Sequence, residues 1–215
     1  MGKLQNLKNS FHQYGAKGMV TRYAYGVIKK LTGVEIKKSI FFVRKIDKPY
    51  EEVLGFERLS FEDFKRAAIN DRNPVKWFSD DKMKIIRKRF DENGIIPFGH
   101  FEGDLLSCIG WINYNGGKIG KIMLSHEDAY FFDDYTIYQF RGKGLQFATI
   151  KFRINEAFSQ GCRQAWSMVY SFNRPSKKNY LKAGFEPALK LTTIENKKGK
   201  IKRKYVYLKS KTLEI

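Results

Sequence analysis

The strongest constraint on the fold is a strand, a glycine turn and a helix that follow one another directly between residues 129 and 161. The run AYFFDDYTIYQF is rich in aromatic and β-branched residues, which is typical of a strand. The run FATIKFRINEAFSQ places apolar residues at three- and four-residue steps and stops at Gly161, which is typical of a helix. The turn between them, residues 141–146, reads RGKGLQ and is both glycine-rich and cationic. We therefore expect a strand that enters a helix through a turn whose main chain can be approached closely.

From about residue 53 onward the chain alternates between these two patterns. Their order, β–α–α–β–β–β–α–β–α–β–β, predicts an α+β domain over residues 51–215. Ser60 is expected to cap one helix, Asn73-Pro74 to begin the next, and Asn173 to cap the last. The run KIGKIMLS predicts a strand, and NKKG at residues 196–199 predicts a hairpin turn.

Residues 1–50 precede this domain as a basic extension with two amphipathic helix patterns. Apolar residues recur at helical steps from Leu4 to Tyr14 and again from Val20 to Leu31, with Lys and Arg interleaved. Gly33 ends the second pattern, and SIFFVRKI at residues 39–46 predicts a short strand. A basic stripe of this kind either packs on its own domain or on a second subunit, or lies on a membrane surface.

Net charge is concentrated at the two ends of the chain. The sequence holds 41 Lys and Arg against 22 Asp and Glu, a net charge of +19. Residues 1–50 contribute 11 basic and 2 acidic side chains, and residues 190–215 contribute 9 and 2. Such ends suit an anionic partner (nucleic acid, acidic lipid or a phosphorylated ligand), or they serve only to keep the protein in solution.

Cysteine usage and hydropathy exclude several classes of protein. Cys108 and Cys162 form no CxxC motif or Cys/His cluster, so we expect a reducing compartment and no structural zinc. No run approaches the ~18 apolar residues that a membrane helix requires, and Lys8, Lys17 and Arg22 interrupt any signal-peptide core. HExxH, a Ser/His/Asp triad and metal-ligand spacing are missing. We predict a cytoplasmic protein that binds no metal.

The turn at residues 141–146 is a candidate phosphate site. The N–H groups that begin the helix after Gly144 have no partners within it, and the helix dipole is positive there. Glycine lets a diphosphate approach the main chain, while Arg141 and Lys143 add charge. Taken alone, the turn is weak evidence and favours a purely structural role, since glycine turns with basic residues are common and this one is neither a Walker loop nor GxGxxG.

A second motif favours a phosphate-binding role for the turn over a purely structural one. Asn173 and Tyr180 are seven residues apart and lie on nearly one face of the predicted helix, with Gly184 and Phe185 following. Together the two motifs resemble those of the GNAT superfamily of acyl-CoA-dependent N-acyltransferases, (Q/R)xxGx(G/A) at residues 141–146 and Asn–x6–Tyr–x3–Gly-Phe at residues 173–185. The resemblance covers roughly residues 53–209. It implies a mixed central β-sheet of about six or seven strands flanked by helices, behind a basic N-terminal helical extension.

Two positions depart from the superfamily pattern. Gln146 stands where Gly or Ala is usual, and a larger side chain there would crowd a diphosphate unless it turns away. The V-x-P that commonly precedes the turn is replaced by residues 136–138, Thr-Ile-Tyr. A second register, residues 139–144, also fits the turn pattern, but residues 141–146 keep the spacing to Asn173.

The resemblance implies direct transfer of an acetyl group from acetyl-CoA to a primary amine. The strand ending at Thr136 would bind the pantetheine arm and polarise the thioester carbonyl, and the turn would hold the diphosphate. Tyr180 would protonate the departing thiolate, or else it packs beneath Phe185 as an ordinary helix tyrosine. The residues implied to hold acetyl-CoA are Tyr135, Thr136, Arg141, Gly142, Lys143, Gly144, Leu145, Gln146, Phe147 and Asn173.

The acceptor amine must lose a proton, because an exposed lysine-like amine is mostly protonated at pH 7. Asp133 and Asp134, on the strand that leads into the turn, are the first candidates for the base. Adjacent strand residues point to opposite faces, so at most one of them serves, and either is otherwise a solvated carboxylate. His126 is a second candidate, while His12 and His100 have no companion pattern.

Two functions of different classes remain. The first is an N-acetyltransferase whose acceptor is a small-molecule or glycan amine, with a weak preference for an amino-sugar or glycan precursor. The second is a catalytically idle GNAT-shaped module that docks on RNA, a protein partner or an anionic membrane through its basic ends, as the aromatic and cationic residues at 202–207 suggest. With either function we expect a cytoplasmic protein, which could also make peripheral contact with the inner membrane surface or with nucleic acid. The sheet edges and the N-terminal stripe permit a homodimer without requiring one.

Overall fold

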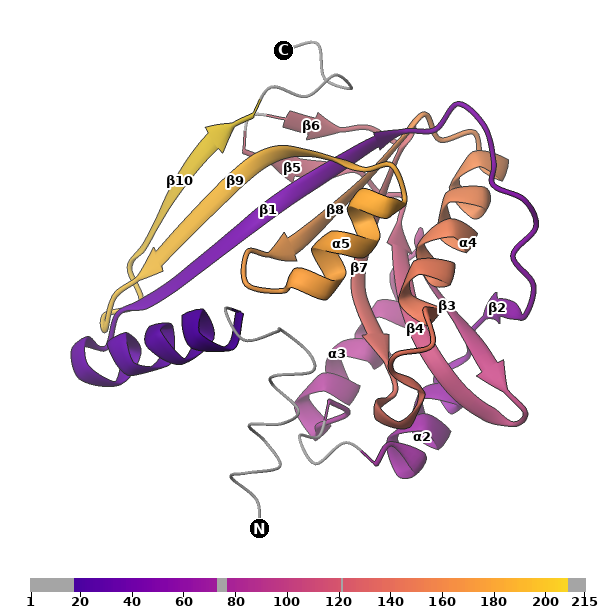
Figure 1. The fold of residues 1–215 in the computed structure, drawn as a ribbon, viewed down its shortest axis with the longest axis horizontal. Coiled ribbons are helices and arrows are strands. Elements are labelled where there is room, and N and C mark those ends of the chain that lie inside the picture. Colours follow the sequence, from indigo (N-terminus) through magenta and orange to yellow (C-terminus); the bar gives the residue numbers. More distant parts are fainter. Residues whose placement is uncertain (1–17, 73–76, 121, 209–215) are drawn as a thin grey trace. The chain divides into compact units, whose positions relative to one another are not determined.

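The computed structural model describes residues 18–72, 77–120 and 122–208. These residues form an α+β protein whose strands pair mostly in antiparallel fashion and are flanked by helices (Figure 1). The chain divides into two compact units, a central unit, Lys45–Trp166, and a terminal unit, Met1–Arg44 with Ser167–Ile215. Within the described residues, no helix combines the length and apolarity needed to span a membrane.

The central unit is built on four antiparallel strands in the order β2-β3-β4-β7. Gly103 and Asp104 join β3 to β4, and Gly103 has a positive φ there. A separate hairpin, β5-β6, turns at Gly120, which also has a positive φ. The bounds are β2 Phe56–Arg58, α2 Phe61–Asn70, α3 Asp80–Phe90, β3 Ile95–Glu102, β4 Leu105–Asn113, β5 Gly117–Ile119, β6 Ile122–Leu124, β7 Asp128–Thr136, a 3-10 turn Tyr138–Phe140 and α4 Leu145–Ser159.

Helices cover both faces of these four strands. A Cβ at Gly110 of β4 would meet the side chains of Thr149 and Arg153, both on α4. The next residue, Trp111, packs instead against Phe64 of α2, with ring centroids 5.4 Å apart. Because neighbouring strand residues point to opposite faces, α4 lies on one face and α2 on the other.

The core on the α2 face is aromatic. Phe64 and Trp111 are fully buried there, and Phe90 at the end of α3 meets both rings edge-on. Burying rings of this size stabilises the fold by about 2 kcal/mol each. The other members of this cluster are Leu59, Ala67, Phe78, Ile86, Leu106, Ile109, Tyr135, Ile137 and Phe140.

Strand β7 carries a bulge directly before the predicted phosphate turn. Ile109 pairs with Tyr135 and Trp111 with Phe132, so three steps along β7 match two steps along β4. The extra residue lies at Asp133, whose φ is 55°. A bulge inserts one unpaired residue and redirects the side chains around it.

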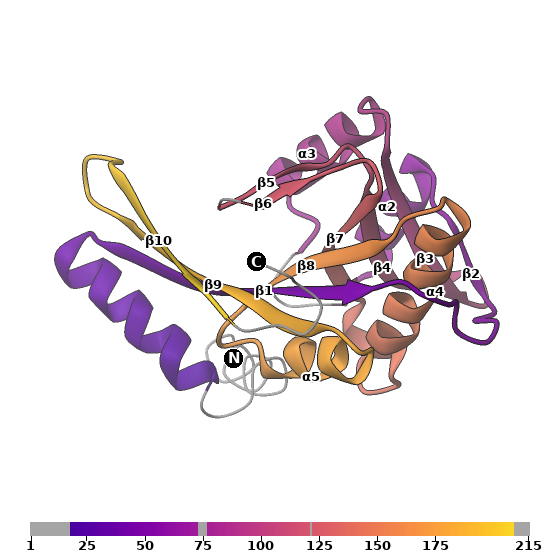
Figure 2. The same cartoon turned by 90° about the horizontal axis from the view of Figure 1, so that it is seen from above.

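The terminal unit holds a helix over residues 18–32, three strands in the order β1-β9-β10, and α5 (Figure 2). Both strand pairs are antiparallel. Strand β8 begins in the central unit and ends in the terminal one. The bounds are β1 Glu35–Lys45, β8 Gln164–Tyr170, α5 Arg174–Lys182, β9 Glu186–Glu195 and β10 Ile201–Tyr207.

Most sequence expectations for individual elements are confirmed. Ser60 caps α2 in a capping box with Asp63, Asn173 caps α5, and the β9-β10 hairpin turns within residues 196–200. Eight described strands lie outside the β5-β6 hairpin, against six or seven expected. The proposed boundary between an extension and a domain near residue 50 stays a prediction.

Three expectations are wrong in detail. The helix expected from Asn73-Pro74 begins at Asp80, because Ser79 accepts a hydrogen bond from the N–H of Lys82 and caps it there; residues 73–76 lie outside the described part. The single strand expected at KIGKIMLS is the β5-β6 hairpin. The strand expected to reach Gln139 ends at Thr136 and continues as a 3-10 turn. The first amphipathic pattern, Leu4 to Tyr14, lies outside the described residues.

Candidate functional site

The turn between β7 and α4 presents main-chain N–H groups without partners. Gly142 and Gly144 have φ angles of 86° and 77°, and Gly144 is the N-cap of α4. The carbonyl of Gly144 accepts from the N–H groups of Phe147 and Ala148. Within the described part of the chain, the N–H groups from Gly142 to Leu145 donate to no acceptor. A helix start in this state is a ready site for an anion.

Helix α4 differs in this respect from its neighbours. The side chains of Ser60, Ser79 and Asn173 cap α2, α3 and α5, and the first turns of α2 and α3 also carry acidic residues. Of the four helices whose N-cap the structure describes, α4 alone has neither a side-chain cap nor an acidic residue in its first turn. Its positive end is therefore neither capped nor neutralised by a side chain of its own first turn.

The two glycines are required by conformation and not by crowding. A Cβ built on Gly142 or Gly144 would meet no protein atom within 4 Å. Their positive φ angles are what favour glycine, since other residues are strained there. The space beside the turn is thus open to a ligand.

The two cationic side chains of the turn lie close to it. Arg141 donates from Nε to the carbonyl of Thr136, 3.2 Å away, and its guanidinium lies over the rings of Tyr135 and Tyr138. Lys143 forms an ion pair with Glu102, with Nζ 2.6 Å from Oε2. Both partners of that pair are partly exposed, so the pair is worth only about 0–1 kcal/mol and an incoming anion can compete for the lysine.

Gln146, the departure from the superfamily motif, turns toward β7. Its Nε2 lies 3.4 Å from Oδ2 of Asp134. This is the orientation required if the larger residue is to leave the start of α4 open.

Asp134 also contacts Arg153, a fully buried cation among the residues that the structure describes. Arg153 of α4 is fully buried, and its Nη2 lies 2.6 Å from Oδ1 of Asp134. The guanidinium further donates to the carbonyls of Thr149 and Trp111. The contact with Asp134 is an ion pair and not a well-aligned hydrogen bond. It ties β7 to α4 directly behind the turn.

Asp133 points to the opposite face, as expected for adjacent strand residues. Its carboxylate forms ion pairs with Lys82 and Arg89, both on α3. The two predicted base candidates are thus separated by the bulge, and each contacts cations. Which group accepts the acceptor's proton stays a prediction.

The last residues of β7 direct their main-chain groups alternately toward β4 and away from it. Ile137 donates its N–H to the carbonyl of Ser107 on β4. Because backbone groups alternate in direction along a strand, those of Thr136 point to the edge away from β4. The Tyr135 ring is buried on the α2 face, where it stacks on Trp77 and its hydroxyl donates to Asp71. Of these two predicted ligands of the pantetheine arm, only Thr136 therefore directs its main chain away from β4, and its carbonyl accepts from Arg141 there.

The second motif lies in the terminal unit. The Asn173 carbonyl oxygen accepts from the N–H of Ser176 and caps α5. Tyr180 is 1 % exposed, stacks on Phe42 and meets Phe185 edge-on at 5.0 Å. The packing against Phe185 is the one foreseen for an ordinary helix tyrosine, and the general-acid role stays a prediction.

Lys177 stands one helical turn after Asn173. Its Nζ donates to the carbonyl of Ser171, 2.6 Å away. Burial, together with the charge of Arg174, lowers the pKa of Lys177 below its usual range. Sequence reasoning assigned this lysine no role.

The histidines and cysteines give no further chemistry. His126 is exposed in the loop before β7, His100 is hydrogen-bonded to Ser107, and His12 lies outside the described residues. Burial raises the pKa of both Cys108 and Cys162 to about 11. Among the residues that the structure describes, no His, Cys, Asp and Glu side chains gather in a group that could hold a metal ion.

A pocket of about 400 Å³ opens on the α3 side of the central unit. Tyr130 and Phe132 of β7 form part of its wall, just before the bulge. Arg89 links it to Asp133, with which it is ion-paired. The remaining lining residues are Ile85, Lys88, Glu92, Ile95 and Asn113. The pocket thus offers an apolar wall, two cations and one carboxylate.

Sequence reasoning missed Arg153 and this pocket. A signal for Arg153 was present, because it occupies the apolar stripe of α4 between Ile150 and Ile154. A charged residue on such a stripe must be paired when it is buried. The pocket had no local signal, since four separate segments form it.

Comparisons with known proteins agree with this fold. No protein-family model and no curated protein matches the sequence. Among solved structures, the chain is similar to a putative acetyltransferase of the GNAT family from Novosphingobium aromaticivorans, with 15% identity and a TM-score of 0.52 over 74% of this chain and 65% of that one. It is also similar to a conserved protein of unknown function from Staphylococcus epidermidis, with 11% identity and a TM-score of 0.52 over 89% and 81%.

At these identities the likeness concerns the fold. The chain has the fold of the GNAT acyltransferases, so the predicted fold class and the resemblance to that superfamily are confirmed at this level. The chain spans 65% of the length of the Novosphingobium protein.

Proposed function

We propose that this protein is an N-acyltransferase that moves an acetyl group from acetyl-CoA to a primary amine. The observation that carries the proposal is the start of α4, where unpartnered N–H groups, two glycines at positive φ and two flanking cations coincide with the superfamily's phosphate turn. The fold shared with a GNAT-family protein supports it.

The N–H groups from Gly142 to Leu145 would hold the diphosphate of coenzyme A. Arg141 and Lys143 would add charge-assisted contacts, which are about twice as strong as neutral hydrogen bonds. The edge of β7 at Thr136 would position the pantetheine arm and polarise the thioester carbonyl.

The chemistry is a single displacement at the thioester carbonyl. The amine nitrogen attacks the carbonyl carbon, a C–N bond forms, the C–S bond breaks, and the electron pair of that bond leaves with sulfur. The amine loses one proton to a base or to water, and the thiolate gains one. By resemblance, Tyr180 donates the proton to sulfur and Asn173 binds the pantetheine.

The acceptor would occupy the pocket lined by Tyr130 and Phe132. These residues lie on β7 directly before the bulge, and so close in sequence to the strand end that would hold the thioester. Glu92 would attract the ammonium form of the amine, while Lys88 and Arg89 would bind an anionic substituent. An amine that carries a phosphate or a carboxylate, such as a phosphorylated amino sugar or a glycan precursor, fits this set of charges.

The rival function is an idle GNAT-shaped module that serves only for docking. The ion pairs of Asp133 and Asp134 and the burial of Tyr180 favour it, because a base or acid must reach the reacting atoms. The two functions differ in whether acetyl-CoA binds and turns over.

The first test measures melting of the full chain with acetyl-CoA and with acetyl-pantetheine, which lacks the diphosphate. Acetyl-CoA at about 100 times its Kd adds about 2.7 kcal/mol, which is about 5–10 °C for a chain of this size. Gly144→Ala places a methyl group in the open space beside the turn and should weaken acetyl-CoA binding at least about tenfold. No shift with acetyl-CoA, or an equal shift with both compounds, would refute the proposal.

Gly161→Ala is the matched control. Gly161 follows the other end of α4, has a φ of 75° and likewise has open space at its Cβ position. It should therefore cost the same backbone strain as Gly144→Ala while leaving acetyl-CoA affinity unchanged. To identify the acceptor, release of the coenzyme A thiol would then be measured with each member of a panel of amines that includes phosphorylated amino sugars, polyamines and peptide N-termini.

A further inference from the structure

The charge of the protein is divided very unevenly between its two units. Residues 1–44 and 167–215 carry 22 Lys and Arg and 4 Asp and Glu, a net charge of +18. Residues 45–166 carry 19 and 18, a net charge of +1. The central unit, which holds the phosphate turn, is therefore almost neutral. An excess of this size on one unit attracts an anionic surface.

The same unit presents an exposed apolar stripe on the helix over residues 18–32. Val20, Tyr23, Val27 and Leu31 recur at steps of three, four and four residues, so they lie along one face. Their exposed fractions are 63%, 73%, 39% and 76%. Ile28, on another side of the helix, is only half-buried. A helix would ordinarily bury such a stripe against its own domain, and here the outer stripe is left to solvent.

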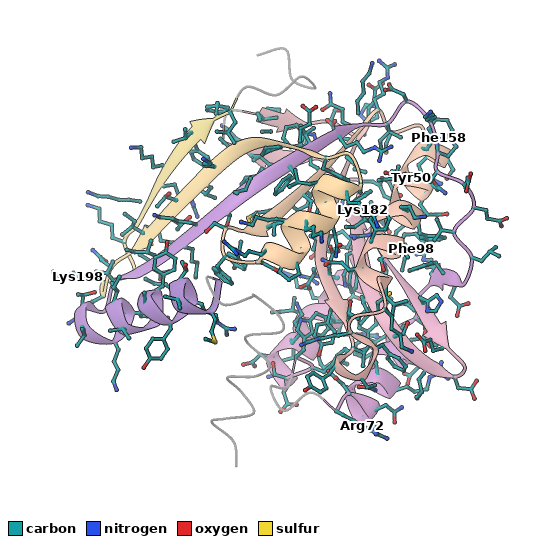
Figure 3. All side chains as sticks on the ribbon, in the orientation of Figure 1. Tyr50, Arg72, Phe98, Phe158, Lys182 and Lys198 are labelled. Atoms are coloured by element: carbon teal, nitrogen blue, oxygen red, sulfur yellow. The ribbon has the colours of Figure 1, made fainter. Side chains whose placement is uncertain are left out.

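Cations border this stripe. Lys30 lies on the same helix beside the stripe and is exposed, and Arg22 is exposed on the far side of the helix. The end of the helix also lies against the β9-β10 turn, because a Cβ at Gly33 would overlap the side chain of Lys197. Lys198, labelled in Figure 3, stands beside it in that turn and is exposed.

The hairpin continues the cationic surface. Strand β10 is exposed along Ile201–Val206, on both of its faces, and not on alternate residues as expected for a strand with one buried face. Lys202, Arg203 and Lys204 belong to this exposed part, and Lys200 precedes it in the turn and is also exposed. The strand thus adds three cations to those of the helix and the turn.

We infer that the terminal unit docks on an anionic membrane surface, with the stripe of helix 18–32 inserted at the headgroup level and the hairpin lysines over the anionic headgroups. Aliphatic side chains gain from entering an acyl boundary, and a tyrosine is well suited to that interface. Val20, Val27 and Leu31 offer nothing to stack on bases, which is what single-stranded nucleic acid requires. The combination of an apolar stripe with a basic border therefore favours lipid over nucleic acid. This inference does not depend on acetyl transfer.

The test is co-sedimentation of the full chain with vesicles of phosphatidylcholine alone and of phosphatidylcholine with about one-third phosphatidylglycerol. Binding is expected to the anionic vesicles only and to weaken as salt is raised. Val20→Gln with Leu31→Gln should reduce binding about tenfold or more, and so should Lys197→Glu with Lys198→Glu. All four side chains are exposed, so folding should be preserved.

Matched controls come from the central unit. Leu54→Gln with Ile69→Gln removes exposed apolar side chains of similar size, and Lys48→Glu with Lys84→Glu makes the same charge change. Both should leave vesicle binding unchanged. An equal loss of vesicle binding in these controls would mean that the total charge or hydrophobicity of the protein determines binding. It would overturn the assignment of the docking surface to helix 18–32 and the hairpin.

Two further measurements test whether this surface binds a different partner. Binding of a uridine oligonucleotide, with no binding to anionic vesicles, would replace the membrane with nucleic acid. A dimer in light scattering that becomes a monomer in Val20→Gln with Leu31→Gln would replace it with a second copy of the chain. Either result would refute the proposal.

Discussion

Arg153 on α4 and Asp134 on β7 form an ion pair behind the predicted phosphate turn, with 2.6 Å between Nη2 and Oδ1 and no part of the arginine side chain exposed. Gln146, in the first turn of α4, reaches the other oxygen of the same carboxylate. The pair therefore fixes how the start of α4 is held against the end of β7. Those are the two elements that would hold coenzyme A.

Asp134→Asn should destabilise the protein by about 3 kcal/mol, because it removes the carboxylate that forms an ion pair with a fully buried guanidinium. Asp133→Asn is the matched control in the neighbouring position. Its partners Lys82 and Arg89 are partly exposed, and asparagine tolerates the φ of 55°. It should cost only about 1 kcal/mol. Urea denaturation measures both, and equal losses would show that the Arg153 pair has no special weight.

Gly110→Ala should destabilise by about 1–3 kcal/mol through overpacking. Its Cβ would lie 2.7 Å from Cζ of Arg153 and 2.8 Å from Cγ2 of Thr149, so the buried pair would have to shift. Gly26→Ala, on the helix over residues 18–32, meets nothing within 4 Å and should instead stabilise that helix by about 1 kcal/mol. Thermal unfolding distinguishes them, and a neutral Gly110→Ala would mean that Arg153 can move.

The capping box of α2 should make stability depend on pH in acid. Burial raises the pKa of Asp63, but hydrogen bonds from Ser60 and the charge of Arg66 outweigh it, so the net pKa is lowered. A lowered folded pKa gives stability that is present above the unfolded pKa of about 3.9 and is lost as pH falls through the folded value. The advantage of the wild type over Asp63→Asn, about 1 kcal/mol at neutral pH, should therefore decline as pH falls below the unfolded pKa and vanish once pH is below the lowered folded pKa. Acid titration of the wild type and Asp63→Asn, followed by circular dichroism, measures this difference, and a constant advantage across the acid range would contradict it.

Local signals in the sequence predicted the elements that are fixed by local chemistry. Ser60 and Asn173 have the side chains that cap helices, and both do so. The turn after Glu195 carries a glycine, Gly199, with a positive φ, and it produced the expected hairpin. The order of strands and helices, and with it the fold class, followed from these signals.

Features fixed by contacts between distant segments were not predictable. The end of β7 at Thr136 depends on Asp71, which accepts from the Tyr135 hydroxyl and from the N–H of Tyr138. The partners of Asp133 come from α3, about 50 residues earlier, and no period in the sequence relates them. For the site, the turn was predictable because it is continuous, whereas the pocket is assembled from four segments.

The two cysteines of the folded chain should not react with the reagent in a thiol-release assay. Burial raises the pKa of Cys108 and of Cys162 to about 11, so both thiols stay protonated at the assay pH of about 8. The folded chain should release no colour with a thiol reagent over the time of an assay, and two equivalents should appear in denaturant. Rapid labelling of the folded chain would contradict the burial of these side chains, and it would also invalidate the acetyl-CoA assay without a cysteine-free variant.

Tyr180→Phe tests the proposed general acid most directly. The ring stacks on Phe42 and meets Phe185, and phenylalanine preserves both contacts, so the free energy of unfolding should change by about 1 kcal/mol or less. If the hydroxyl protonates the departing thiolate, kcat should fall about tenfold or more while the KM for acetyl-CoA stays the same. Tyr114→Phe, in the half-buried Tyr114 of the central unit, should leave kcat unchanged. A Tyr180→Phe variant with wild-type kcat would make Tyr180 a packing residue. Acetyl transfer would then stand on the turn and on β7 alone.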